Sequence, residues 1–183
     1  SLGGIPAMKH YDFAPRFEQI YLRAVARYGQ GVRQAAGLFD ATETAWLAAN
    51  GLTSQHLFDY AEDHAGYGEP GLAEAVAIET LRHSYFLDFQ QGHWTGATID
   101  PAKMPAKSDT AGGIPWLARL IPKTKAKLRG ELPTSLMYGC AGDRAFFREH
   151  DIGPSEFLGL VFRHEQDDAA IIAWVKARRQ AAR

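Results

Sequence analysis

Residues 41–58 read ATETAWLAANGLTSQHLF, and residues 141–158 read AGDRAFFREHDIGPSEFL. The two stretches align without a gap at an offset of 100 residues, and large apolar residues coincide at Trp46 and Phe146, Leu47 and Phe147, Leu52 and Ile152, Leu57 and Phe157, and Phe58 and Leu158. The repeat predicts two copies of one helical unit that share a core, because a few short helices bury too little apolar surface alone. Chance similarity between two amphipathic hairpins is the alternative, since helical patterns are degenerate.

Helical spacing of apolar residues continues on both sides of the repeat, whereas strand signals are scarce. The expected helices cover about residues 12–25, 40–50, 54–64, 72–92, 114–129, 141–149, 154–164 and 168–179. Asp40 and Glu43 have the spacing of a capping box, Asn50–Gly51 is typical of a helix end, and Pro122 predicts a kink. The sequence therefore predicts an all-α fold of two related helical units packed together by internal tandem duplication.

The domain organisation follows from where this periodicity stops. We interpret residues 1–7 as a cloning remnant, because Met8 begins a more ordinary opening. Residues 8–92 form the first expected unit and residues 113–183 the second. The intervening residues 93–112 contain several glycines and prolines without sustained periodicity, which is typical of a linker. We expect the two units to form one compact domain.

Composition narrows the class of protein. The 183 residues are 46% hydrophobic and 22% charged, as in soluble globular proteins, and no apolar run is long enough to cross a membrane. The single cysteine, Cys140, excludes an intrachain disulfide and fits a cytoplasmic protein. The net charge of −1 is divided unevenly, with −6 over residues 1–100 and +5 over residues 101–183. Neither half is basic enough to favour nucleic acid as a main partner.

The second half carries a family pattern. Residues 112–132 read GGIPWLARLIPKTKAKLRGEL, followed by the loop YGCAGD at 138–143, the pair Phe146–Phe147 and a terminal helix containing Trp174. Over about residues 110–179 this series resembles a bacterial family known as domain of unknown function 5069. The resemblance implies a fold for the second half, and reaches the first half only through the repeat. It implies no activity.

The first candidate site is a catalytic one with a cysteine nucleophile. Cys140 is expected in a loop ahead of a helix, where the helix dipole favours a thiolate, and Asp143 lies three residues further on. A small packed cysteine is the structural alternative.

Ligand binding is the second candidate. The basic residues Arg119 and Lys123 lie one helical turn apart and favour a small anionic ligand, although a solvated helix face explains them equally well. Tyr60 and Tyr138 are aromatic residues of the kind that line binding surfaces and also small helical cores.

A metal ion is the third candidate. His56, Asp59 and Asp63 are spaced to share one helical face, and His83 on the next helix would complete a carboxylate and imidazole site if the two helices pack together. Acidic residues on a helix are more commonly a solvated face, and no tight metal-binding motif is present.

These candidates favour a binding or interaction module that self-associates into a homo-oligomer and has a cleft between its two halves. The first alternative is an enzyme that uses that cleft, with either Cys140 or the His/Asp site as reactive centre. The second is weak nucleic-acid binding through the basic helix at 119–129. The sequence names no cofactor.

Overall fold

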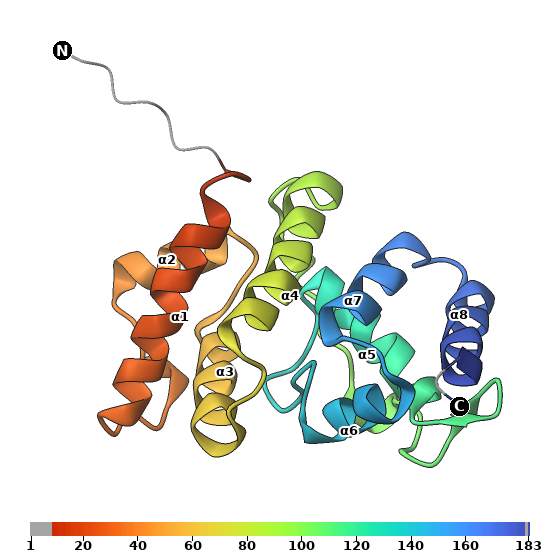
Figure 1. Ribbon diagram of the computed structural model, residues 1–183. Helices are drawn as coiled ribbons and strands as arrows, with labels where there is room; N and C mark the ends of the chain where they lie inside the picture. The colour runs from red at the N-terminus through yellow and green to blue at the C-terminus, as the bar shows by residue number, and fades with distance from the viewer. Residues whose placement is uncertain (1–8, 182) are drawn as a thin grey trace. The chain divides into compact units, whose positions relative to one another are not determined.

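The computed structural model describes residues 9–181 and 183, and over these residues the chain is mostly helical, as predicted (Figure 1). It contains eight α-helices in the described part, together with one two-stranded hairpin that was not predicted. Residues 1–7, interpreted above as a cloning remnant, lie outside the described residues. No helix in the described ranges combines the length and apolar character that a membrane span requires.

The chain divides into two compact units, the first ending at Thr80 and the second running over Leu81–Arg183. The division lies inside α4 (Leu72–Ser84), earlier than the boundary at residue 92 expected from the sequence. Arg82 accounts for this difference. Its side chain is fully buried, donates to the Leu128 carbonyl at 2.5 Å, and lies over the rings of Phe86 and Trp94. All of these partners belong to the second unit.

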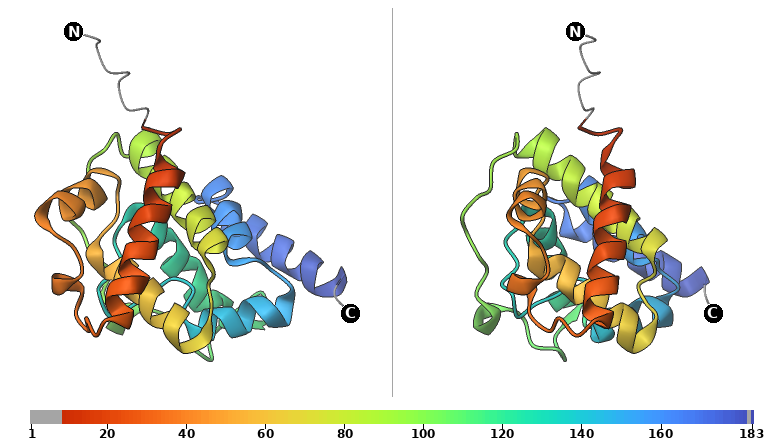
Figure 2. Two further views of the ribbon diagram at one scale, coloured as in Figure 1. Left: turned by 60° about the vertical axis from the view of Figure 1, so that its left-hand side comes forward. Right: turned by 90° about the vertical axis from the view of Figure 1, so that its left-hand side faces the viewer.

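The first unit is built around α1 (Phe13–Gly29) and α3 (Ser54–Tyr67), which pack against each other (Figure 2). The apolar face of α1 supplies much of the core through Phe17, Ile20 and Ala24, all fully buried. The ring of Phe17 meets that of Tyr60 edge-on at 6.5 Å between centroids. Aromatic burial of this kind is a large share of the stability of a small helical unit.

Two further elements complete the first unit before α4, namely η1 (Ala35–Gly37) and α2 (Ala41–Ala49). The predicted capping box of α2 is present: Asp40 accepts from the Glu43 backbone N–H at 2.8 Å, and the Glu43 carboxylate accepts from Asp40 N–H. Glu43 is 2% exposed and also accepts from Arg23 at 2.9 Å and Arg27 at 3.1 Å, both on α1. The carboxylate thus ties α2 to α1.

The second unit begins with the end of α4 and contains the elements η2 (Tyr85–Phe89), η3 (Pro101–Lys103), β1 (Thr110–Ala111), β2 (Ile114–Pro115), α5 (Leu117–Arg129), α6 (Ala141–His150), α7 (Pro154–Arg163) and α8 (Asp168–Ala181). Within this unit α5 packs against α7, and α6 contacts α8. Leu117, Leu120, Phe157 and Leu160 are fully buried. The last three predicted helices agree with α6, α7 and α8 to within two residues.

The helix predicted over residues 114–129 begins later than expected. Ile114 and Pro115 pair with Ala111 and Thr110 in the hairpin, and Trp116 has a φ of +71°, so that α5 starts at Leu117. Pro122 lies inside α5. Apolar periodicity extended the predicted helix because Ile114, like the core residues of α5, is buried.

Residues 93–112, expected as a linker, lie within the second unit and are held to it by hydrogen bonds. Ile99 N–H donates to the Glu131 carbonyl at 2.9 Å, and Arg119 donates to the Pro105 carbonyl at 3.0 Å. Apart from the short elements η3 and β1, the backbone of this segment forms scattered loop hydrogen bonds and no α-helix, so its sequence lacks helical periodicity.

Candidate functional site

The sequence-predicted residues Cys140 and Asp143 come together with Lys123 in the second unit. Lys123 lies in the middle of α5, Cys140 occupies the N-cap position of α6, and Asp143 follows in the first turn of α6. The Lys123 Nζ atom is 2.7 Å from Asp143 Oδ2 and 3.2 Å from Cys140 Sγ. Lys123 is 3% exposed and Asp143 is fully buried.

The Asp143 carboxylate is further satisfied by two neutral donors. The Gly139 backbone N–H donates to Oδ2 and the Trp116 indole donates to Oδ1, each at 2.9 Å. A buried carboxylate with a cation and two N–H donors is fully compensated, so this cluster fixes the loop before α6 against α5. Cys140 makes no side-chain capping bond at its N-cap position. The catalytic roles predicted for Cys140 and Asp143 stay predictions.

The other predicted ligand residues have separate partners. Besides the Pro105 contact of Arg119, the Tyr138 hydroxyl donates to the Pro154 carbonyl at 2.6 Å. In the first unit the Tyr60 hydroxyl donates to Glu79 Oε1 at 2.8 Å. The structure therefore places Lys123 beside Cys140 and Asp143, and it uses Arg119, Tyr138 and Tyr60 in other contacts.

The residues predicted to bind a metal are placed on α3 and α4. His56 takes part in the capping box of α3, where its Nδ1 accepts from Thr53 N–H at 3.3 Å, and Asp59 accepts from Gln55 at 2.8 Å. Asp63 follows on α3, and His83 is buried near the end of α4. Over residues 9–181 and 183, no group of three or more His, Cys, Asp or Glu side chains is arranged to hold a metal ion. The four residues therefore belong to no such group.

The basic helix at 119–129 is largely neutralised by contacts inside the second unit. Lys125 Nζ lies 2.5 Å from the Asp168 carboxylate, and Arg129 pairs with Glu165 at 2.7 Å. Lys123 and Lys127 are buried. The α5 charges thus form no continuous exposed stripe.

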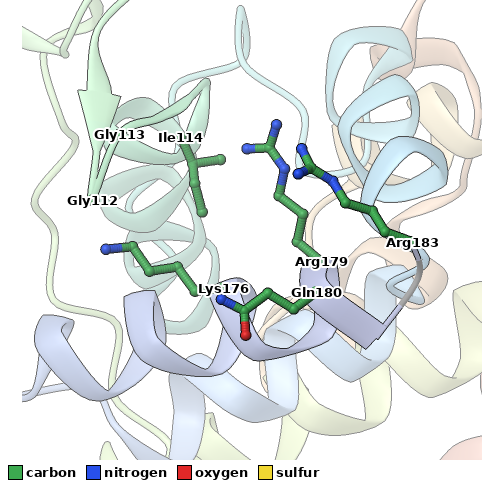
Figure 3. A pocket seen from close by; sticks show the side chains of 7 residues that line it. All are labelled: Gly112, Gly113, Ile114, Lys176, Arg179, Gln180 and Arg183. Atoms are coloured by element: carbon green, nitrogen blue, oxygen red, sulfur yellow. The ribbon is translucent and has the colours of Figure 1, made fainter.

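A pocket that sequence analysis missed lies between the hairpin turn and α8 (Figure 3). Its volume is about 290 Å³, and its lining consists of Gly112, Gly113, Ile114, Lys176, Arg179, Gln180 and Arg183. Three of these seven residues are cations and none is acidic. Lys176 extends toward the turn, whereas Arg179 and Arg183 rise from the end of α8.

The hairpin turn can lie this close to α8 because Gly112 lacks a side chain. Gly112 and Gly113 have φ values of +58° and +78°, as a two-residue hairpin requires. A Cβ atom on Gly112 would collide with the Ile172 side chain and lie 2.8 Å from Lys176 Cε. One wall of the pocket is therefore bare backbone, which gives a ligand close access to peptide groups.

The pocket cations differ from their neighbours in charge pairing. Arg178, next in sequence to Arg179, donates to Glu156 at 2.9 Å and 3.0 Å and to the Asp151 carbonyl. Lys176, Arg179 and Arg183 form no ion pair with any residue in the described part of the chain. The pocket consequently concentrates uncompensated positive charge.

Two sequence signals would have located this pocket. The Gly112–Gly113 pair is a hairpin-turn signal, and the basic residues Lys176, Arg179 and Arg183 near the C-terminus have spacing i, i+3 and i+7. Each has an ordinary explanation taken alone, as a loop and as cations suited to a helix C-terminus. Only the tertiary structure places them together.

Comparison with known proteins finds a family match that lies within the second unit. Residues 103–183 match the family described as Domain of unknown function (DUF5069), and this range includes the hairpin, the Lys123 cluster and α8. No curated protein and no solved structure matches the chain. The matched range contains all seven lining residues of the pocket and every residue of the Lys123 cluster, and we conclude that residues 103–183 form a DUF5069 domain.

Proposed function

We propose that the second unit binds a small anion in the pocket between the Gly112–Gly113 turn and α8. The observation that carries this proposal is that Lys176, Arg179 and Arg183 line one pocket that has no acidic residue in its lining. The proposal keeps the binding function and the small anionic ligand predicted from the sequence. It assigns them to residues that the sequence did not single out.

The arrangement of cations in the pocket supports the binding of an anion, because without one the cations repel each other and reduce stability. Repulsion between like charges one helical turn apart destabilises a helix by about 0.2–0.5 kcal/mol per pair. Lys125, Arg129 and Arg178 each have an acidic partner within the same unit. An anion bound in the pocket would supply the compensation that Lys176 and Arg179 lack.

The size and donors of the pocket support a small ligand. A cavity of about 290 Å³ is at the lower end of ligand pockets, which span roughly 300–1,000 Å³. Guanidinium groups bind oxyanions through paired N–H donors, and an ammonium adds a point charge. The combination suits an organic anion of a few heavy atoms.

Substitution of Arg179 tests the proposal. We expect the chemical shifts of α8 backbone amides to respond saturably to sulfate, and Arg179→Gln to weaken this binding at least tenfold. Arg178→Gln is the matched control, because it removes the same charge from the adjacent position without touching the pocket. Absence of saturable binding, or equal weakening in both variants, would contradict the proposal.

We also infer that the two units descend from a duplication, as the sequence repeat suggests. The helix starts support it, since α2 and α6 begin at residues 41 and 141, and α3 and α7 at 54 and 154. A buried acid in the first turn, Glu43 or Asp143, is bound in each unit by a cation 20 residues earlier, Arg23 or Lys123. Superposition of the units, each as a rigid body, tests this, and a best fit at an offset other than 100 would refute it.

The remaining expectations stay predictions. These are a cleft between the halves, self-association, a cytoplasmic location, an enzyme centred on Cys140 or a His/Asp metal site, and nucleic-acid binding by residues 119–129. The contacts of Lys125 and Arg129 give no observation in favour of nucleic acid.

A further inference from the structure

We infer that the anion is the phosphate monoester of a small molecule, an inference that rests on the anion-binding function proposed above. The first argument is charge. A phosphate monoester carries about −1.5 to −2 charges at pH 7, whereas a single carboxylate carries one. The pocket presents three cations, so a monocarboxylate would leave most of their charge uncompensated.

The second argument is the direction of the donors. Lys176, Arg179 and Arg183 come from α8 and the residues after it, and the backbone of Gly112–Gly113 closes the opposite side (Figure 3). Lys176 extends across the turn, apart from the direction taken by the two arginines. A carboxylate offers two oxygens in one plane, whereas a phosphate ester offers three terminal oxygens that point in different directions. The Lys176 ammonium is set apart from the two guanidinium groups, so an anion that reaches both must offer oxygens in more than one direction, which favours the tetrahedral group.

The third argument concerns the rest of the ligand. Gln180 is the exposed uncharged side chain of the lining, whereas Ile114 is buried, so the neutral groups that face a ligand are an amide and the backbone of the glycine turn. A short hydroxylated carbon chain attached to the phosphate can form hydrogen bonds to both. The volume of about 290 Å³ leaves room for such a chain.

Calorimetric titration of the whole chain with two probes of similar size and charge tests the inference. The probes are glycerol monophosphate, whose charge is on one tetrahedral group, and malonate, whose charge is divided between two planar carboxylates. We expect glycerol monophosphate to bind at least tenfold more tightly than malonate at pH 7.5. Arg179→Gln and Lys176→Gln should each reduce its affinity at least tenfold, whereas Arg178→Gln should change it less than twofold.

The outcomes separate this inference from the proposed function. Binding of malonate as tight as that of glycerol monophosphate, with both lost in Arg179→Gln, would overturn the phosphate assignment and leave anion binding in place. Absence of binding by both probes would overturn both. Thermal unfolding of each variant, measured without ligand, identifies any loss of affinity caused by misfolding. If Arg179→Gln is unstable, Lys176→Gln provides the same comparison, because Lys176 is an exposed side chain.

Discussion

Lys123 and Asp143 form a buried ion pair with 2.7 Å between Nζ and Oδ2, in which the lysine is 3% exposed and the aspartate is fully buried. The pair joins α5 to the first turn of α6, and its position repeats that of Arg23 and Glu43 in the first unit at an offset of 100 residues. Because both side chains are buried, water cannot replace either partner, and loss of one charge leaves the other uncompensated.

Removal of the lysine charge should therefore destabilise the protein strongly. Lys123→Met keeps much of the side-chain volume but leaves the Asp143 carboxylate without its cation, and we expect a loss of about 3–5 kcal/mol in unfolding free energy. Lys125→Met breaks the exposed pair with Asp168 and should cost less than about 1 kcal/mol. Urea denaturation measures the unfolding free energy of both variants. Similar losses would show that the buried pair contributes no more to stability than the exposed pair.

Glu43 should make stability depend on pH in the acidic range. Burial raises the pKa of Glu43, but hydrogen bonds from Arg23, Arg27 and the Asp40 backbone outweigh that effect and lower it to about 2. A carboxyl with a lowered folded pKa stabilises the protein above its unfolded pKa, and that stability is lost as pH falls toward the folded value. We expect a loss of up to about 3 kcal/mol between pH 5 and pH 2.

The matching variant is Glu43→Gln, which cannot titrate at this position. The difference in unfolding free energy between wild type and Glu43→Gln should be largest above pH 5 and should shrink as the pH is lowered. A difference that is constant from pH 6 to pH 3 would contradict the assignment.

The N-cap positions of α2 and α6 should respond in opposite ways to substitution. Asp40 caps α2 through its side chain, whereas Cys140 occupies the same position of α6 without a capping bond. Asp40→Ala should cost about 1 kcal/mol, and Cys140→Ser should gain about 0.5–1 kcal/mol because serine accepts from the third backbone N–H of a helix. Thermal unfolding tests this, with Cys140→Ala as the control that adds no acceptor. Equal effects of the serine and alanine variants would rule out capping as the cause.

The two glycines of the hairpin turn should differ in their tolerance of alanine. Both have left-handed backbone conformations, so either substitution costs about 1–2 kcal/mol in strain. A Cβ on Gly113 meets nothing within 4 Å, whereas a Cβ on Gly112 collides with Ile172. We expect Gly112→Ala to cost about 1–3 kcal/mol more than Gly113→Ala in chemical denaturation. Equal costs would mean that the turn moves away from α8 with little resistance.

Helices with strong local signals could be predicted from the sequence. Two local signals predicted the first residue of a helix. The capping box of Asp40 and Glu43 gave the start of α2, and Pro154 gave the start of α7. Predictions failed where contacts distant in sequence decide the conformation. Trp116 ends the hairpin with a positive φ, and its indole donates to Asp143, which lies 27 residues later. No local pattern encodes that partnership.

The candidate site divides in the same way. Cys140, Asp143 and Lys123 were each selected from the sequence for their chemistry, and the fold brings them together. The pocket residues Gly112 and Lys176 were not selected, because a glycine in a loop and a lysine on a helix have ordinary explanations when considered separately.

The sequence by itself determined the helical class, the ends of most helices, the repeat at 100 residues and the family pattern of the second half. These depend on apolar periodicity and capping, which act over a few residues and are visible in the order of amino acids. The tertiary structure alone decided that Lys123 is buried against Asp143 and that a bare glycine turn faces three cations of α8 and the residues after it. Both arrangements join segments separated by at least 20 residues, and the balance of burial and charge that fixes them exists only once the chain has folded.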